Sequence, residues 1–134
     1  MPLLIIFNGD IMKTVYKNFT LHRIRLSDNL KEIAKVVEPP IDKSKMIIDV
    51  DRIDGEFDRI LQLVCPYIHT GDKVLVGGHP LLCHIIITAC MIKGAIPHMT
   101  KIDECKRTYY IYRVKTYFDI TRKERLQLEN TEIL

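Results

Sequence analysis

The chain has 134 residues, of which 47% are hydrophobic and 28% charged, a composition that describes one folded domain and excludes a disordered tail. Its 20 Lys and Arg residues against 17 Asp and Glu residues leave a net charge of +3. This is too small for a protein that binds duplex DNA, in which a strong basic excess is expected. A domain of this size leaves no room for a separate regulatory domain, so we expect any large ligand to be shared by an oligomer.

The cysteine and histidine residues give no metal-binding pattern. Four cysteines and five histidines are present, but no C-x-x-C or H-E-x-x-H spacing occurs among them. We therefore expect neither a metal nor a cofactor, and a reducing cytoplasm as the compartment. The apolar N-terminal run meets Asn8 at once and is too short for a signal peptide or a membrane span, so no membrane contact is expected.

In chain order, the first half of the sequence predicts two strands and two helices. The continuous apolar run at 3–7 is typical of a strand buried on both faces at the centre of a parallel sheet. A short helix over 10–18 and an alternating strand over 19–26 are expected next. Ser27 is placed to cap a helix that runs to Val37, where a Glu-Pro-Pro sequence stops it.

The second half carries the clearest pattern, a strand, a helix and a second strand that form a β-α-β unit. It is preceded by an unclear stretch, in which 46–50 is either a short strand or a loop. The Tyr- and Val-rich run at the end is predicted to pair antiparallel with the strand before it. The predicted elements are a helix over 54–69, a strand over 73–76, a tight turn at 77–80, a helix over 81–93 ended by Gly94, a strand over 95–101 and a strand over 108–119.

This alternation predicts an α/β fold. We expect a single Rossmann-like domain over 1–120, with a mostly parallel central sheet, helices on both faces and an antiparallel edge strand near the C-terminus. Residues 121–134 are predicted to form a polar C-terminal extension that is partly frayed. In such sheets ligands bind outside the carboxyl ends of the strands, at the point where the strand order reverses.

Two turns compete for that position. Asn8-Gly9-Asp10 follows the first predicted strand, and Gly77-Gly78-His79 follows the strand over 73–76. If both strands are central and adjacent, the turns form one site. There, glycine lets backbone N–H groups approach a phosphate closely, and the next helix offers its positive N-terminus. Neither G-x-G-x-x-G nor a P-loop sequence occurs, which disfavours a dinucleotide coenzyme or a Walker-type NTPase. The alternative is a Gly-Gly turn that is only structural.

Each candidate side chain has a functional and a structural interpretation. His79 is an acid, a base or a phosphate ligand, or else a plain helix cap. Asn8 orients a ligand or suits the turn, and Asp10 is a base or a cap. Lys13 reaches a phosphate from the first helix or is simply solvated. The residues expected to complete an electropositive rim are Thr100, Lys101, Lys106 and Arg107.

With these residues laid out, the chain resembles the small CRISPR-associated proteins of type III systems that have a minimal Rossmann-like, CARF-type domain. The resemblance rests on the opening sequence L-L-I-I-F-N-G-D and on the order of motifs between Gly71 and Lys101: G-D-K-V-L-V, a polar turn, an apolar helix, K-G-A-I-P and a threonine-basic ending. The closing strand Y-Y-I-Y-R-V-K is also typical of these proteins. About a third of the chain carries the match.

The resemblance implies a homodimer that binds a cyclic tetra-adenylate ring across its two-fold axis. Some relatives are ring nucleases, in which a ribose 2′-hydroxyl attacks the adjacent phosphate without a metal, and others only bind the messenger. By position, Asn8, Gly9, Gly77, Gly78 and His79 are expected to contact the ring, with Thr100 and Lys101 near its rim, and His79 and Asn8 are the candidate catalytic residues.

The turn in this chain reads G-G-H-P, where relatives often carry an acidic or amide residue. Binding is therefore better supported than cleavage. Three hypotheses remain open: a metal-independent ring nuclease, a non-catalytic binder that sequesters or senses cyclic oligoadenylate, and a small interaction module with no nucleotide ligand.

Overall fold

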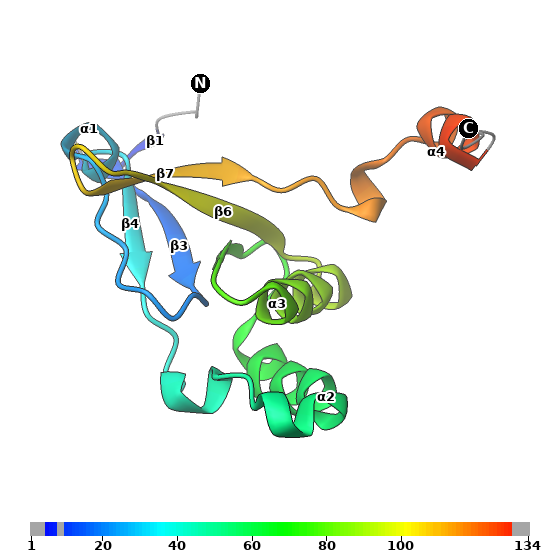
Figure 1. The fold of residues 1–134 in the computed structure, drawn as a ribbon. Helices are drawn as coiled ribbons and strands as arrows, with labels where there is room; N and C mark the ends of the chain where they lie inside the picture. The colour runs from blue at the N-terminus through cyan, green and yellow to red at the C-terminus, as the bar shows by residue number, and fades with distance from the viewer. Residues whose placement is uncertain (1–4, 8–9, 130–134) are drawn as a thin grey trace.

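The computed structural model describes residues 5–7 and 10–129 of the chain. Its centre is a five-stranded sheet in which four neighbouring strands are parallel and the last is antiparallel (Figure 1). The structure therefore confirms an α/β fold with a mostly parallel sheet and an antiparallel edge strand. In spatial order the strands are β4 (Ala34–Val37), β3 (Thr14–Asn18), β5 (Lys73–Val76), β6 (Ile96–Asp103) and β7 (Thr108–Arg113).

The first strand of this sheet is not the one that the sequence predicts. β1 (Ile5–Phe7) and β2 (Asp10–Met12) pair antiparallel in a separate two-stranded sheet, so the expected central strand over 3–7 is wrong, as is the helix over 10–18. β3 takes the central position, pairing parallel with β4 on one side and with β5 on the other. Its β-branched and aromatic residues Thr14, Val15 and Tyr16 suit a pleated strand better than a helix.

The segment between β3 and β4 also differs from expectation. No regular strand forms over 19–26, where only Leu26 makes an isolated bridge, to Tyr109 of β7. Ser27 caps the next helix as predicted, since its hydroxyl accepts a hydrogen bond from the Leu30 N–H at 3.3 Å. That helix, α1 (Asp28–Lys31), ends early, and β4 follows because Val36 and Val37 precede Pro39 and favour an extended backbone.

The middle of the chain follows the predictions closely. The stretch before the second helix contains two short 3₁₀ turns, η1 (Lys43–Met46) and η2 (Val50–Arg52), and its 46–50 portion forms no strand. The predicted helix over 54–69 is present as α2 (Ile53–Val64), continued by η3 (Cys65–Tyr67), where Pro66 changes the last turn. The unit of β5, α3 (Pro80–Lys93) and β6 is confirmed, with Gly94 in the left-handed conformation that ends α3.

The C-terminal part leaves the sheet earlier than predicted. β7 ends at Arg113, and the remainder of the predicted strand contains η4 (Tyr117–Asp119) instead. α4 (Arg122–Glu129) follows and lies away from the sheet at the end of an extended arm (Figure 1). This arm places several aromatic and aliphatic side chains in solvent, among them Tyr117, Phe118 and Leu128.

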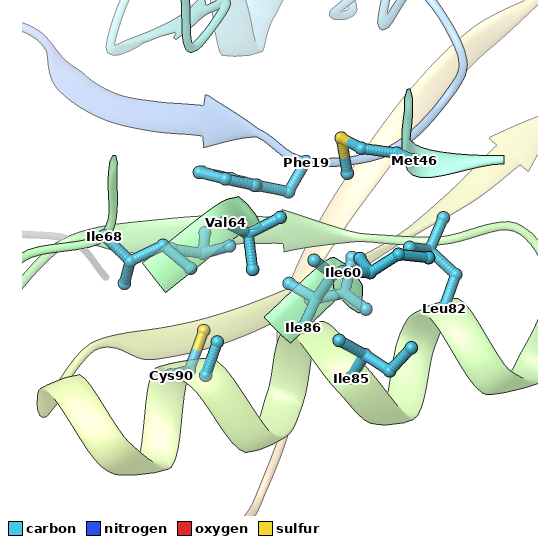
Figure 2. Packing of buried hydrophobic residues seen from close by; sticks show 12 residues of the cluster. Phe19, Met46, Ile60, Val64, Ile68, Leu82, Ile85, Ile86 and Cys90 are labelled. Atoms are coloured by element: carbon cyan, nitrogen blue, oxygen red, sulfur yellow. The ribbon is translucent and has the colours of Figure 1, made fainter. Parts of the chain in front are cut away.

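One hydrophobic cluster holds α2 and α3 against the sheet (Figure 2). Val74 and Val76 of β5 point to the same face and meet Ile60 of α2 and Ile86 of α3, all fully buried. Burial of each such side chain contributes roughly 1.5–3 kcal/mol. Because β5 and α3 are fixed on both sides of the turn at 77–79, that turn has a defined position. The other buried members of the cluster are Phe19, Met46, Val64, Ile68, Leu82, Ile85, Ala89 and Cys90.

Candidate functional site

The strand order reverses between β3 and β5. β4 follows β3 in the chain and lies on one side of it, whereas β5 and β6 continue on the other side. Open parallel sheets bind ligands outside the carboxyl ends of the strands at this reversal. Here the two carboxyl ends are Asn18 of β3 and Val76 of β5. The predicted turn at 77–79 thus lies at the switch point, but its neighbour is the segment after Asn18 rather than the one at Asn8.

The backbone of the turn approaches this neighbouring segment closely. A Cβ atom added to Gly77 would come within 3.3 Å of Thr20 Cγ2, which is tighter than ordinary van der Waals contact. Because Gly77 has no side chain, the segments that follow β5 and β3 can pack together. Gly78 has a φ of 98° and therefore requires glycine for a different reason. Both glycines have a structural role, and Gly78 is exposed at the surface of the switch point.

His79 is the N-cap of α3. Its Nδ1 accepts a hydrogen bond from the Leu81 N–H at 3.1 Å. Only an unprotonated ring nitrogen accepts such a bond, so the neutral imidazole carries its proton on Nε2. The exposed ring then presents a hydrogen-bond donor to a ligand and has no free basic nitrogen. Since Pro80 has no N–H and Leu81 donates to His79, α3 has fewer first-turn donors for an anion than an uncapped helix.

Two predicted rim residues lie at the same edge. Val76 of β5 pairs with Met99 of β6, so Thr100 is level with Gly77 and Lys101 is one residue beyond. β6 continues to Asp103 and pairs there with β7, which extends past the end of β5. Thr100 is half-buried and Lys101 is exposed. The sheet therefore brings Gly77, Gly78, His79, Thr100 and Lys101 to one edge, as the sequence predicts.

A buried amide network at the end of β3 was not predicted. The Asn18 side chain is 1% exposed. Its Nδ2 donates to His22 O and to Glu38 Oε1, both at 2.8 Å, and its Oδ1 accepts from the Thr20 N–H and hydroxyl at 2.9 and 2.6 Å. A fully satisfied network of this kind fixes the loop conformation. The only sequence signal is the short polar pair in Asn-Phe-Thr, which the incorrect helix assignment concealed.

Lys43 contacts the backbone of this network. Its Nζ donates to Asn18 O at 2.5 Å and to Thr20 O at 2.6 Å, and it lies 3.4 Å from Glu38 Oε2. Burial lowers the pKa of Lys43, while the neighbouring Glu38 carboxylate opposes that shift. An ammonium group with these partners holds two backbone carbonyls at the switch point and adds positive charge to it.

Thiols near the site are poor nucleophiles. Cys83 lies in the first turn of α3, and its Sγ is 3.7 Å from Gly78 O. Burial raises its pKa, and burial raises the pKa of Cys90 to about 12, so both remain protonated at neutral pH. Within residues 5–7 and 10–129, no three His, Cys, Asp or Glu side chains are grouped to hold a metal ion.

Two of the predicted site residues that the structure describes, Lys13 and Asp10, are not brought to this edge. Lys13 precedes β3 and lies at the amino ends of the strands, beside the start of β4. The prediction that Lys13 binds the ligand together with the Gly77 turn is wrong. Lys13 lies before the amino end of β3, whereas the turn lies beside the carboxyl end of that strand. Asp10 belongs to β2 and is not a helix cap. Asn8 and Gly9 lie outside the described residues.

No family model, curated protein or solved structure matches the chain. Of the helices that the structure describes, none combines the length and the apolar character needed to cross a bilayer.

Proposed function

We propose that this chain binds a cyclic oligoadenylate, of the cyclic tetra-adenylate type, at the switch point between β3 and β5. The observation that carries the proposal is the meeting of the Gly77-Gly78-His79 turn with Thr100 and Lys101 at the carboxyl edge of a parallel sheet. In that position we expect the His79 Nε2–H and the Lys101 ammonium to donate to phosphate oxygens. The Thr100 hydroxyl, which the alternation of β6 places on the opposite face of the sheet, is a donor at the rim. The sequence resemblance to the CARF-type proteins supplies the ligand class.

The proposed binding unit is a homodimer with the ring on its two-fold axis. A chain of 134 residues offers few donors to a four-phosphate ring, and two copies double them. The exposed Tyr117 and Phe118 on the C-terminal arm, 58% and 69% accessible, support a contact between copies, because exposed apolar clusters mark interaction sites. Four free cysteines support a reducing, cytoplasmic compartment.

The proposal extends to ring opening. A ribose 2′-oxygen attacks the adjacent phosphorus, the bond from phosphorus to the 5′-oxygen breaks, and the 2′-hydroxyl proton is transferred to that leaving oxygen. The products are a 2′,3′-cyclic phosphate and a 5′-hydroxyl, with no water consumed. The contribution expected of His79 is hydrogen-bond donation to the charged phosphate from Nε2. Because Nδ1 is occupied by the cap, His79 does not serve as the base while the cap is intact.

A non-catalytic binder is the second candidate, and this cap favours it. Purified protein in excess over labelled cyclic tetra-adenylate, with a chelator present, separates the two functions. We expect linear product with a 2′,3′-cyclic phosphate end. Unchanged ligand after full binding would refute the nuclease and leave the binder.

Binding itself is tested by thermal unfolding. Ligand at 100 times its dissociation constant adds about 2.7 kcal/mol to the free energy of unfolding. We expect Lys101→Gln to reduce the resulting shift in Tm. The matched control Lys93→Gln, in the last turn of α3 at the end opposite His79, should retain the shift. The absence of any shift with cyclic tri-, tetra- or hexa-adenylate would favour an interaction module without a nucleotide ligand.

A further inference from the structure

A cationic hollow lies at the other end of the sheet from the switch point. It has a volume of about 670 Å³ and is bounded by the extended segment over 23–26, Lys31 at the end of α1, the first residues of β4 and Lys13. This volume is within the range of small-ligand sites. Five of its lining residues are cationic and none is acidic: Lys13, Arg23, Arg25, Lys31 and Lys35.

The extended segment presents alternating charge and apolar surface because its sequence is Arg-Ile-Arg-Leu. Leu26 is 5% exposed and makes its bridge to Tyr109, and Arg25 O accepts a hydrogen bond from the Tyr109 N–H at 2.9 Å. β7 thus anchors the backbone of this segment. Arg23 and Arg25 are exposed, so their guanidinium groups are attached to a fixed backbone rather than to an unsupported loop.

The positive charge of the hollow has little internal compensation. Among the described residues, its one ion pair joins Lys31 Nζ to Asp28 Oδ1 at 4.0 Å, with both side chains largely in solvent. Such a pair contributes almost nothing. Five of the chain's 20 Lys and Arg residues line this one hollow without an acidic residue among them, so a bound polyanion would relieve their mutual repulsion.

The floor of the hollow is aliphatic. Leu26 and Ala34 are buried there, and Ile24 and Val36 are half-buried. A ligand made only of phosphate would leave this surface unused, whereas a flat heterocyclic base would cover it. The combination of a cationic rim and an aliphatic floor fits a ligand that has both parts.

We infer that this hollow is a binding site for a nucleoside polyphosphate, with phosphate oxygens on the Arg and Lys side chains and the base on the aliphatic floor. Arginine suits this task because its planar fork binds phosphate oxygens in pairs. The site is separate from the Gly77 turn and does not depend on the function proposed for it. A compact ligand fits a hollow bounded by a segment, a helix and a strand better than a continuous nucleic-acid strand does.

Calorimetric titration with ATP, inorganic tripolyphosphate and adenosine tests the inference. We expect ATP to bind more tightly than tripolyphosphate and adenosine to bind weakly. The double variant Arg23→Gln/Arg25→Gln should weaken ATP binding at least tenfold, the loss expected for one charge-assisted hydrogen bond. Arg122→Gln/Lys123→Gln removes the same charge from α4 and should leave the affinity within twofold.

Equal losses in the two double variants, or no ATP binding, would overturn the site, and tripolyphosphate binding as tightly as ATP would overturn the role of the floor. Tighter binding of single-stranded RNA, abolished by the same Arg substitutions, would replace the ligand class. Lys35→Gln, an exposed single change, serves if the Arg variant does not fold. Cyclic tetra-adenylate binding by the Arg variant is the control: retained affinity keeps the two sites distinct, and lost affinity refutes that separation.

Discussion

The Gly77-Gly78 turn allows a quantitative test of the geometry at the switch point. Gly78 has a φ of 98°, and an added Cβ would find its nearest neighbour, Leu82 Cδ2, at 3.9 Å. Space is therefore available, and the cost of Gly78→Ala comes from the backbone alone. A non-glycine residue in such a region costs about 1–3 kcal/mol, so we expect the free energy of unfolding to fall by that amount.

Gly77→Ala is the matched substitution, in which the loss of stability comes from a steric contact and not from the backbone conformation. Gly77 has no positive φ, but its new Cβ would be 3.3 Å from Thr20 Cγ2. We expect a cost of roughly 1 kcal/mol or less, because a shift of a few tenths of an ångström relieves the contact. Thr20→Ser removes Cγ2 and keeps the hydroxyl that bonds Asn18, so the double variant should recover most of the loss.

These changes in the free energy of unfolding are measured by urea unfolding of the wild type, the three single variants and the two double variants that combine Thr20→Ser with Gly77→Ala or with Gly78→Ala. Recovery is expected for Gly77→Ala only, since Thr20 is not near the Cβ of Gly78. Two results would refute the reasoning: a Gly78→Ala protein as stable as wild type, or a Gly77→Ala loss that Thr20→Ser does not change.

Three further predictions concern Glu56 in the first turn of α2, the cap of α3 and the C-terminal arm. Glu56 is 6% exposed and accepts hydrogen bonds from the Asp49 N–H and from Arg59; these bonds, those of Arg59 first, lower its pKa to about 2. Its ionised form therefore stabilises the fold fully above the usual Glu pKa near 4.5, and this contribution is lost as pH falls towards 2. Glu56→Gln should flatten the dependence of Tm on pH between these values. Parallel Tm–pH curves for the variant and the wild type would contradict this. His79→Ala removes the cap of α3 and should cost about 0.5–1.5 kcal/mol by urea unfolding; cleavage lost with binding retained would show a chemical role as well, whereas unchanged binding and cleavage would leave His79 as a cap only. If the proposed dimer forms through the arm, Tyr117→Ser/Phe118→Ser should give a folded monomer in sedimentation experiments, and a dimer that persists in this variant would exclude the arm as the contact.

The part of the fold that sequence patterns predict well is the part with local partners. β5, α3 and β6 follow one another directly, and Pro80 and Gly94 mark the two ends of the helix. The N-terminal half is predicted less well because the central position of β3 comes from its pairing with β4 and β5, and its short β-branched and aromatic run does not reveal that pairing. The apolar run at 3–7 is the stronger strand signal, but its described residues pair in a separate hairpin.

In the candidate site, too, the residues with a local sequence signal are predicted and the contacts between distant segments are not. Gly77, Gly78 and His79 were identified because a strand-to-helix turn has a recognisable composition, and Thr100 and Lys101 because they follow the next strand. The contacts of Lys43 with Asn18 and Thr20 could not be predicted, because an ammonium group that binds backbone carbonyls of a distant segment leaves no spacing or composition signal in a single sequence.

The pairing of β3 with β5 has a consequence for the order of folding. β5, α3, β6 and β7 lie consecutively within 73–113, so they can associate after closing only short loops. β3 must instead find β5 across a long loop, and the Lys17–Asp72 ion pair that accompanies this pairing joins residues 55 apart. Closing such a loop has an entropic cost that local pairs avoid. We therefore expect backbone amides of β5 and β6 to gain protection from hydrogen exchange before those of β3 during refolding, with the switch point completed last.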